Sequence, residues 1–139
     1  MPDFKLSDAA KLAGVPIKKM TRDIDRGVIE IQGGEPGKGN PRRFNLDCIY
    51  KTAIGWALAR AYVPPKKAMA LAQLYFEPQR GRVLGRPFAD GKTLMLVTDG
   101  VGSIINLQID QDISPHLRQA TIVVDIGNII STVNARLIN

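Results

Sequence analysis

The chain has 139 residues, a formal net charge of +6 at pH 7 and 45% hydrophobic residues, so it can bury a core as one globular domain or two small ones. No apolar run is long enough to span a membrane and residues 1–5 do not open a secretory signal, so we expect a cytoplasmic protein with no membrane partner. Cys48 is the only cysteine, which excludes an intramolecular disulfide.

Two short helices around a tight turn are predicted near the N-terminus. Ser7 is a good N-cap residue and Gly14 suits a helix stop, so we expect a first helix over residues 8–13. Pro16 can occupy the first turn of a second helix, where its missing N–H costs nothing, and Gly27 ends that helix. Two helices joined by a turn of three to four residues form a helix-turn-helix.

The second predicted helix has an apolar face and a basic face. The apolar residues recur at i, i+3 and i+7 and form the expected buried stripe: Ile17, Met20 and Ile24. The basic face repeats every fourth residue and has two flanking residues: Lys18, Arg22 and Arg26, flanked by Lys19 and Thr21. Most charged helix faces are only solvated surface, so this pattern alone is a weak indication of a DNA partner.

A Gly- and Pro-rich hairpin is expected after these helices. Residues 28–31 and 42–44 are predicted as two short strands, with a glycine-rich loop between them. Arg42 and Arg43 lie on the returning strand, and Lys38 lies at the tip of the loop. Arginine suits bidentate contacts with phosphate, and such contacts fix a protein on a duplex without reading its sequence.

Several residues of this N-terminal part form a pattern that spans all of these elements. They are Leu6, Ala9 to Val15, Met20, Asp25 to Ile29, Arg42 to Phe44, Leu46, Asp47 and Ile49. The pattern resembles the winged helix-turn-helix of the MerR-like regulators, a fold that some phage excisionase-type and small-terminase DNA-binding modules share. The resemblance covers residues 5–72 and departs from the family at Thr21 and Asp23, where an arginine and a tyrosine are typical. It implies a DNA-binding domain over about residues 1–80.

Two further helices follow the predicted wing. Asn45 can cap a helix over about residues 46–62, and Trp56 on its apolar face is expected in the core. The next helix is expected over residues 65–76, with these residues facing inward: Ala68, Leu71, Ala72 and Tyr75. The long dimerisation coiled coil of MerR-like regulators has no counterpart, because prolines and glycines interrupt residues 78–87.

The second half of the chain changes to short apolar runs. We predict strands over residues 93–98 and 103–109, joined into a hairpin by a turn at 99–102, and a third strand over 121–125. Apolar residues at helical spacing predict a closing amphipathic helix: Ile126, Ile129, Ile130, Val133 and Leu137. The expected fold class is therefore α+β, a winged helix-turn-helix followed by a small β-hairpin, strand and helix domain over residues 81–139.

This C-terminal domain is near the lower size limit for a self-supporting core, and its apolar strands carry little charge. We therefore expect it to pair with a second copy, as a homodimer or higher oligomer. Residues 1–82 carry 15 Lys/Arg against 8 Asp/Glu, whereas residues 83–139 carry 4 against 5. The basic half is the one expected to bind a polyanion.

No catalytic, metal or cofactor site is indicated. Residues 33–39 contain a Gly-Lys pair but lack the Ser or Thr that follows the lysine of a phosphate loop. The single histidine, His116, has no acid or nucleophile at a helpful spacing, and together with the one thiol of Cys48 it cannot form a metal site. Cys48 is expected as a small buried residue of the third helix. We expect neither enzyme activity nor a cofactor.

The sequence favours a sequence-specific protein that binds double-stranded DNA as a dimer, either a transcriptional regulator or a phage-type accessory factor. The residues expected to contact DNA are Lys18, Lys19, Thr21, Arg22, Arg26, Lys38, Arg42 and Arg43. The alternative is a protein-interaction or scaffold protein whose helix-turn-helix binds another protein, because fold alone does not imply function.

Overall fold

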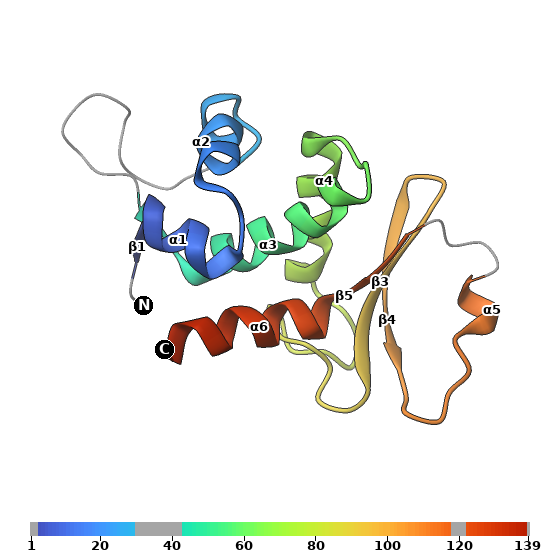
Figure 1. The fold of residues 1–139 in the computed structure, drawn as a ribbon. Coiled ribbons are helices and arrows are strands. Elements are labelled where there is room, and N and C mark those ends of the chain that lie inside the picture. The colour runs from blue at the N-terminus through green and yellow to red at the C-terminus, as the bar shows by residue number, and fades with distance from the viewer. Residues whose placement is uncertain (1–2, 30–42, 118–121, 139) are drawn as a thin grey trace.

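The computed structural model describes residues 3–29, 43–117 and 122–138. All the described helices except the short α5 gather on one side of the three-stranded sheet, and α5 lies beyond its other side (Figure 1), so the predicted α+β class is confirmed. The elements in chain order are β1 (Phe4–Lys5), α1 (Leu6–Ala13), α2 (Ile17–Asp25), β2 (Arg43–Phe44), α3 (Leu46–Arg60), α4 (Pro65–Ala72), the 3₁₀ helix η1 (Gln73–Phe76), β3 (Lys92–Thr98), β4 (Val101–Leu107), α5 (Ser114–Leu117), β5 (Ile122–Asp125) and α6 (Ile126–Ile138).

The first element, β1, is a two-residue strand that was not predicted from the sequence. β1 pairs antiparallel with β2 and places Lys5 opposite Arg43. Because β1 keeps the backbone extended as far as Lys5, α1 starts directly after it at Leu6. Ser7 therefore lies inside the helix, and its prediction as the N-cap residue is wrong.

The predicted hairpin lies only partly within the described residues. Val28 and Ile29 form a bend after α2 rather than a strand. Their N–H groups both donate to the backbone carbonyl of Asp23, at 2.8 and 3.1 Å, so the chain folds back on the last turn of α2. Residues 30–42, which include Arg42, lie outside the described residues, and the wing loop stays a prediction.

α2 differs from the prediction at its first residue. Met20 and Ile24 are buried, as expected for the apolar stripe. Ile17 is 47% exposed, so its predicted place in that stripe is wrong. Ile17 is the first residue of the helix, and in this part of the chain the core is reached by Val15 of the preceding turn and by Met20 one turn further on.

α3 is the central helix of the fold. Its predicted cap is confirmed, because the N–H of Cys48 donates to the side-chain oxygen of Asn45 at 2.8 Å. Ile54 and Leu58 are fully buried, since α1, α4 and α6 all pack against this helix. Trp56 and Cys48 pack against the same core but stay partly exposed, so their predicted burial is only partly right.

α4 and η1 occupy the predicted fourth helix, with its last turn tightened to 3₁₀ geometry. All four residues predicted to face inward are buried: Ala68, Leu71, Ala72 and Tyr75. The Tyr75 ring packs edge-to-face on Phe76, with centroids 5.1 Å apart. Its hydroxyl lies in the interior without a hydrogen bond to any described group. Burial raises the pKa of Tyr75, so the hydroxyl stays protonated at all physiological pH values.

We expect Tyr75→Phe to leave the free energy of unfolding unchanged or to raise it by up to about 1–2 kcal/mol, because it removes a desolvated hydroxyl and nothing else. Tyr50→Phe is the matched control. The Tyr50 hydroxyl donates to Asn134, so Tyr50→Phe removes one hydrogen bond between α3 and α6 and should lower stability by about 1 kcal/mol. Urea unfolding followed by circular dichroism measures both changes. A loss above about 1 kcal/mol in Tyr75→Phe would show that its hydroxyl is hydrogen-bonded in solution.

The C-terminal sheet has the strand order β4-β3-β5, and both pairs of neighbours are antiparallel. The predicted hairpin is confirmed with a shorter turn. Asp99 and Gly100 have φ angles of 50° and 77°, which suits a two-residue type I′ turn, and β4 begins directly after it at Val101. The predicted third strand and closing helix are also present as β5 and α6.

The outer edge of β4 is capped near its middle. In an antiparallel hairpin, hydrogen-bonded and non-hydrogen-bonded residue pairs alternate. Counted from the turn, Ile104 and Met95 form a non-hydrogen-bonded pair, so the N–H and C=O of Ile104 point away from β3. Its carbonyl accepts a hydrogen bond from Nε2 of Gln79 at 2.6 Å. This edge is therefore blocked as a continuous site for pairing with a second copy, and self-association stays a prediction.

Arg82 ties the segment between the helices and the sheet into a compact loop. It is 8% exposed, and its Nη1 donates to the carbonyls of Tyr75 and Arg86 at 2.7 and 3.2 Å. Nη2 donates to the carbonyl of Glu77 at 3.4 Å, and Nε donates to Oε1 of Gln79 at 3.0 Å. Burial lowers the pKa of Arg82. The Arg82 side chain therefore forms hydrogen bonds to three backbone carbonyls and one side-chain oxygen, all within the twelve residues 75–86.

α6 returns from the sheet to the helices and runs along α1 and α3 (Figure 1). Ile130 and Val133 lie in the same hydrophobic core as the residues of α1 and α3. The Tyr50 hydroxyl of α3 donates to Oδ1 of Asn134 at 2.5 Å. The predicted division at residue 80 stays a prediction, and this shared core means that residues 1–80 alone would lack the apolar partners that α6 supplies.

Candidate functional site

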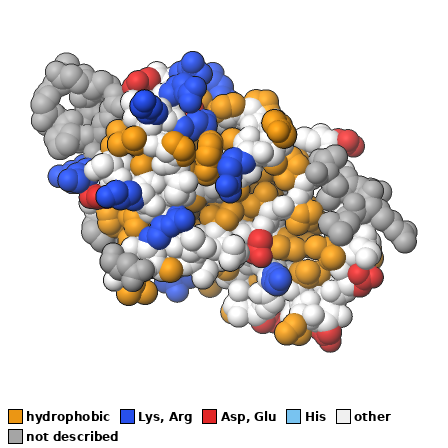
Figure 2. All heavy atoms as spheres, in the orientation of Figure 1, with side chains coloured by type: hydrophobic (Ala, Val, Ile, Leu, Met, Phe, Trp, Pro, Cys, Tyr) orange, Lys and Arg blue, Asp and Glu red, His pale blue; other side chains and the backbone are white. Residues whose placement is uncertain are grey.

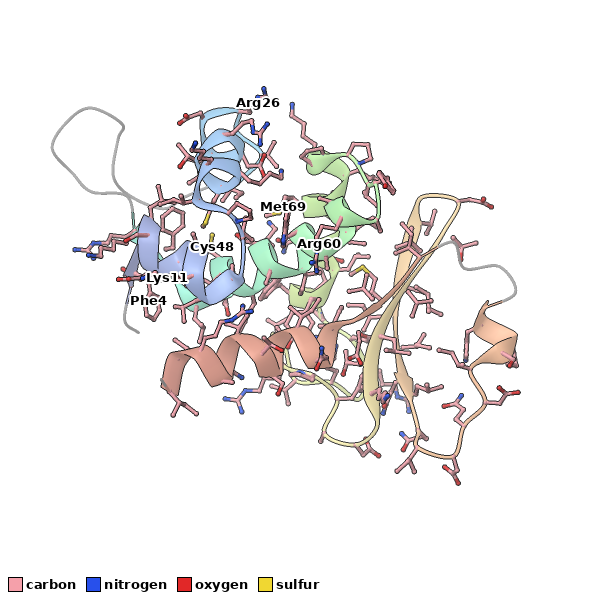
Figure 3. All side chains as sticks on the ribbon, viewed as in Figure 1. Phe4, Lys11, Arg26, Cys48, Arg60 and Met69 are labelled. Carbon is pink, nitrogen blue, oxygen red and sulfur yellow. The ribbon has the colours of Figure 1, made fainter. Side chains whose placement is uncertain are left out.

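α2 presents a basic face at the surface of the molecule. Lys18, Arg22 and Arg26 are exposed, and Figure 2 shows lysine and arginine side chains gathered over the region of α2. Arg26 lies at the outer end of α2, away from α3 and α6 (Figure 3). Because residues four apart share one side of a helix, the three cations lie on a common face, as predicted.

A shallow open groove of about 570 Å³ follows this face. It is lined by Ile17, Lys18, Thr21, Arg22, Asp25 and Arg26. The Thr21 hydroxyl donates to the carbonyl of Ile17 at 2.8 Å, so it is held against the helix and retains its capacity to accept a hydrogen bond. The exposed Ile17 side chain supplies an apolar patch beside the cations. The groove thus combines three cations, the carboxylate of Asp25, one hydroxyl and one aliphatic surface.

The turn before α2 has a defined geometry. Gly14 has a φ of 72°, in the left-handed region that favours glycine, and its N–H donates to the carbonyl of Lys11 at 3.2 Å. The N–H of Val15 donates to the carbonyl of Ala10 at 3.0 Å. Pro16 then serves as the N-cap of α2 rather than lying in its first turn, which corrects its predicted position by one residue. Two helices are thereby joined by three residues.

Lys19 is placed differently from the other cations of α2. It is partly buried, its Nζ forms an ion pair with Asp23 at 2.5 Å, and it lies 6.0 Å from the ring centroid of Trp56. Arg60 lies over the same ring at 5.8 Å. Lys19 therefore faces α3, and a DNA contact by Lys19 stays a prediction on which our proposal does not rely. The i, i+4 spacing of Lys19 and Asp23 was the one sequence signal of this pair.

The basic wing residues are only partly within the described chain. Arg43 is exposed on β2, directly opposite the exposed Lys5 of β1, whereas Lys38 and Arg42 lie outside the described residues. Two like charges on opposite strand positions repel each other, and a bound anion would relieve that repulsion. Lys5 was not predicted as a site residue. It lies opposite Arg43 only because β1 pairs with β2, and these two strands are far apart in the sequence.

A cavity of about 410 Å³ lies at the start of α3, and its lining includes Arg43, Cys48, Lys51 and Phe76. Burial raises the pKa of Cys48, so its thiol is protonated at neutral pH and is a poor metal ligand. Within residues 3–29, 43–117 and 122–138, no three His, Cys, Asp or Glu side chains come together as a possible metal site. None of the helices in those ranges is both long and apolar enough to cross a bilayer.

A comparison with protein-family models found no match to this chain, and a comparison with curated proteins found no significant relative. The likeness to MerR-like regulators stays a prediction of the sequence.

Proposed function

We propose that this chain binds double-stranded DNA, with α1, the turn at Gly14 and α2 acting as a helix-turn-helix. The observation that carries the proposal is the exposed face of α2, where Lys18, Arg22 and Arg26 line one surface groove. Cations that neutralise phosphates release condensed counterions, so an aligned set of them gives affinity for any duplex. Residues 1–82 carry more Lys and Arg than Asp and Glu, so the half of the chain that contains α2 also attracts a negatively charged duplex.

The dimensions of α2 suit a helix that reads the major groove. An α-helix with its side chains is about 10–12 Å across, which fits the major-groove width of about 12 Å, and the nine residues of α2 give about two and a half turns that can lie in the groove. The N-terminal part of such a helix reaches base edges, so in our proposal Lys18, Thr21 and Arg22 face the bases and Arg26 contacts a phosphate. The exposed Ile17 would then meet the methyl group of a thymine, an apolar contact that contributes to base discrimination.

The wing belongs to the same proposal. Arg43 and Lys5 form a basic strand pair, and the predicted contacts of Arg42 and Lys38 would extend it along the backbone of the duplex. In this MerR-like arrangement, α2 selects sequence and the wing fixes orientation. We further propose that two copies act together on half-sites related by a dyad, as in a transcriptional regulator or a phage accessory factor.

A fluorescence-anisotropy titration of a mixed-sequence duplex at about 50 and 200 mM salt tests the proposal. We expect binding at the lower salt concentration and a loss of at least about tenfold at the higher one, because the affinity depends on phosphate contacts. If the duplex does not bind at the lower salt concentration, the basic face serves another class of partner, such as an acidic protein, and the proposal fails.

A further inference from the structure

The last turn of α1 is completed by a side chain from the far end of the chain. Nη1 of Arg136, on α6, donates to the backbone carbonyl of Leu12 at 2.9 Å. The N–H groups of Gly14 and Val15 already satisfy the two preceding carbonyls. Arg136 therefore bonds a carbonyl that an α-helix leaves without an internal partner at its C-terminus. A cation at this position is also favoured by the helix dipole.

Gly14 provides the space for this contact. A Cβ atom at Gly14 would lie 2.7 Å from Nη1 of Arg136, which is too close for both to keep their places. The left-handed backbone of Gly14 has a separate reason, the end of α1, which the sequence already indicated. Gly14 thus has two roles: its left-handed backbone ends α1, and its lack of a side chain leaves room for the Arg136 guanidinium.

Arg136 is held in position by the residues before it on α6. Val133 is fully buried in the shared core, and Asn134 accepts the hydrogen bond from Tyr50 of α3. Both anchors lie within one helical turn of Arg136, so its guanidinium extends from a fixed backbone onto the end of α1.

We propose that Arg136 is a positioning residue for α2. α2 starts after three residues beyond α1, so the point and direction at which α1 ends set where α2 projects. By bonding the carbonyl of Leu12, Arg136 fixes that end and makes the C-terminal helix part of the DNA-reading unit. Its effect on DNA affinity rests on the proposed function, whereas its effect on the geometry of residues 14–26 does not.

Hydrogen–deuterium exchange of the full-length protein without DNA tests the positioning directly. Arg136→Met keeps the aliphatic stem and removes the donor, Arg136→Lys keeps a charged donor, and Lys92→Met removes one exposed charge from β3 as the control. We expect Arg136→Met to speed exchange of residues 14–26 about fivefold or more, while α3 and β3 keep their protection. Arg136→Lys should recover most of the protection, and Lys92→Met should behave like the wild type.

The same proteins are then titrated with the mixed-sequence duplex. Arg136→Met should lose about tenfold in affinity, and Lys92→Met no more than about threefold. Unchanged exchange of residues 14–26 in Arg136→Met would overturn the inference, and so would a uniform rise over all elements, which shows a general loss of stability. If exchange changes as expected but the wild type binds no duplex, the positioning by Arg136 stands and the proposed function fails.

Discussion

Replacing Lys18, Arg22 and Arg26 together by alanine is expected to weaken binding to a duplex by about 10²-fold or more. Each cation that neutralises one phosphate contributes about 0.9 to the slope of log K against log salt, so the slope should flatten by up to about 2.7. Alanine is the best helix former, and Met20 and Ile24 still hold the buried side of α2, so the helix itself should persist. Anisotropy titrations over a range of salt concentrations measure both quantities.

The control removes the same amount of charge elsewhere. Arg80, Arg86 and Lys92 are exposed on the loop before the sheet and on β3. Their triple alanine variant has the same net charge as the α2 variant, and we expect it to lose less than about fivefold in affinity. Equal losses in the two variants would show that binding follows net charge and that α2 is not the reading helix.

Arg82→Met is expected to lower the free energy of unfolding by about 3–5 kcal/mol, because it removes four hydrogen bonds from a charged donor, and this is a large share of the 5–15 kcal/mol typical of a domain. The change leaves the buried carbonyl of Tyr75 without its donor, which is costly, and it also removes the hydrogen bonds to the carbonyls of Glu77 and Arg86, which belong to exposed residues. It also removes the cation from the Tyr75 ring, which lies 4.9 Å from the guanidinium carbon. Urea unfolding followed by circular dichroism gives the difference.

Two further variants separate hydrogen bonding from charge. Arg82→Lys keeps the charge, but a compact ammonium cannot reach acceptors on several sides as the planar guanidinium does, so we expect a loss of at least about 2 kcal/mol. Arg80→Met changes an exposed neighbour and should stay within about 0.5 kcal/mol of the wild type. A loss below about 1 kcal/mol in Arg82→Met would contradict the role of Arg82 as the organiser of this loop.

The elements of this fold could be predicted where the signal is local. Gly14 ends α1 because it adopts a left-handed backbone, and Asn45 starts α3 because its side chain caps the N–H of Cys48. Asp99 and Gly100 join β3 to β4 because both adopt positive φ. In each case one or two residues determine the backbone around them, so no knowledge of the remaining chain is needed.

The features that could not be predicted depend on contacts between distant residues. The strand pair of Lys5 and Arg43 is too short to produce a periodic pattern in the sequence. Because of this pair, α1 begins at Leu6, before the predicted cap residue Ser7. The exposure of Ile17 depends on where the core ends, which helical periodicity does not show. The bond from Arg136 to α1 joins the two ends of the chain and has no counterpart in sequence spacing.

The same limit applies to the candidate site. The face of Lys18, Arg22 and Arg26 follows from the period of an α-helix, which the sequence contains in full. Lys19 has the same charge and lies on the same helix, yet it packs between Asp23 and Trp56 because α3 lies on that side. Only the tertiary structure separates a cation at the surface from one used within the fold.

The central claim is that α2 is the surface that meets DNA, and chemical-shift mapping by NMR tests it most directly. The full-length protein is labelled with ¹⁵N and titrated with a mixed-sequence duplex at low salt. We expect the largest chemical-shift changes at the amides of residues 17–26, with further changes at Lys5 and Arg43, and little change at the amides of β3 and β5. Chemical-shift changes confined to residues 92–125, or none at saturating duplex, would contradict the role of α2 as the DNA-binding surface.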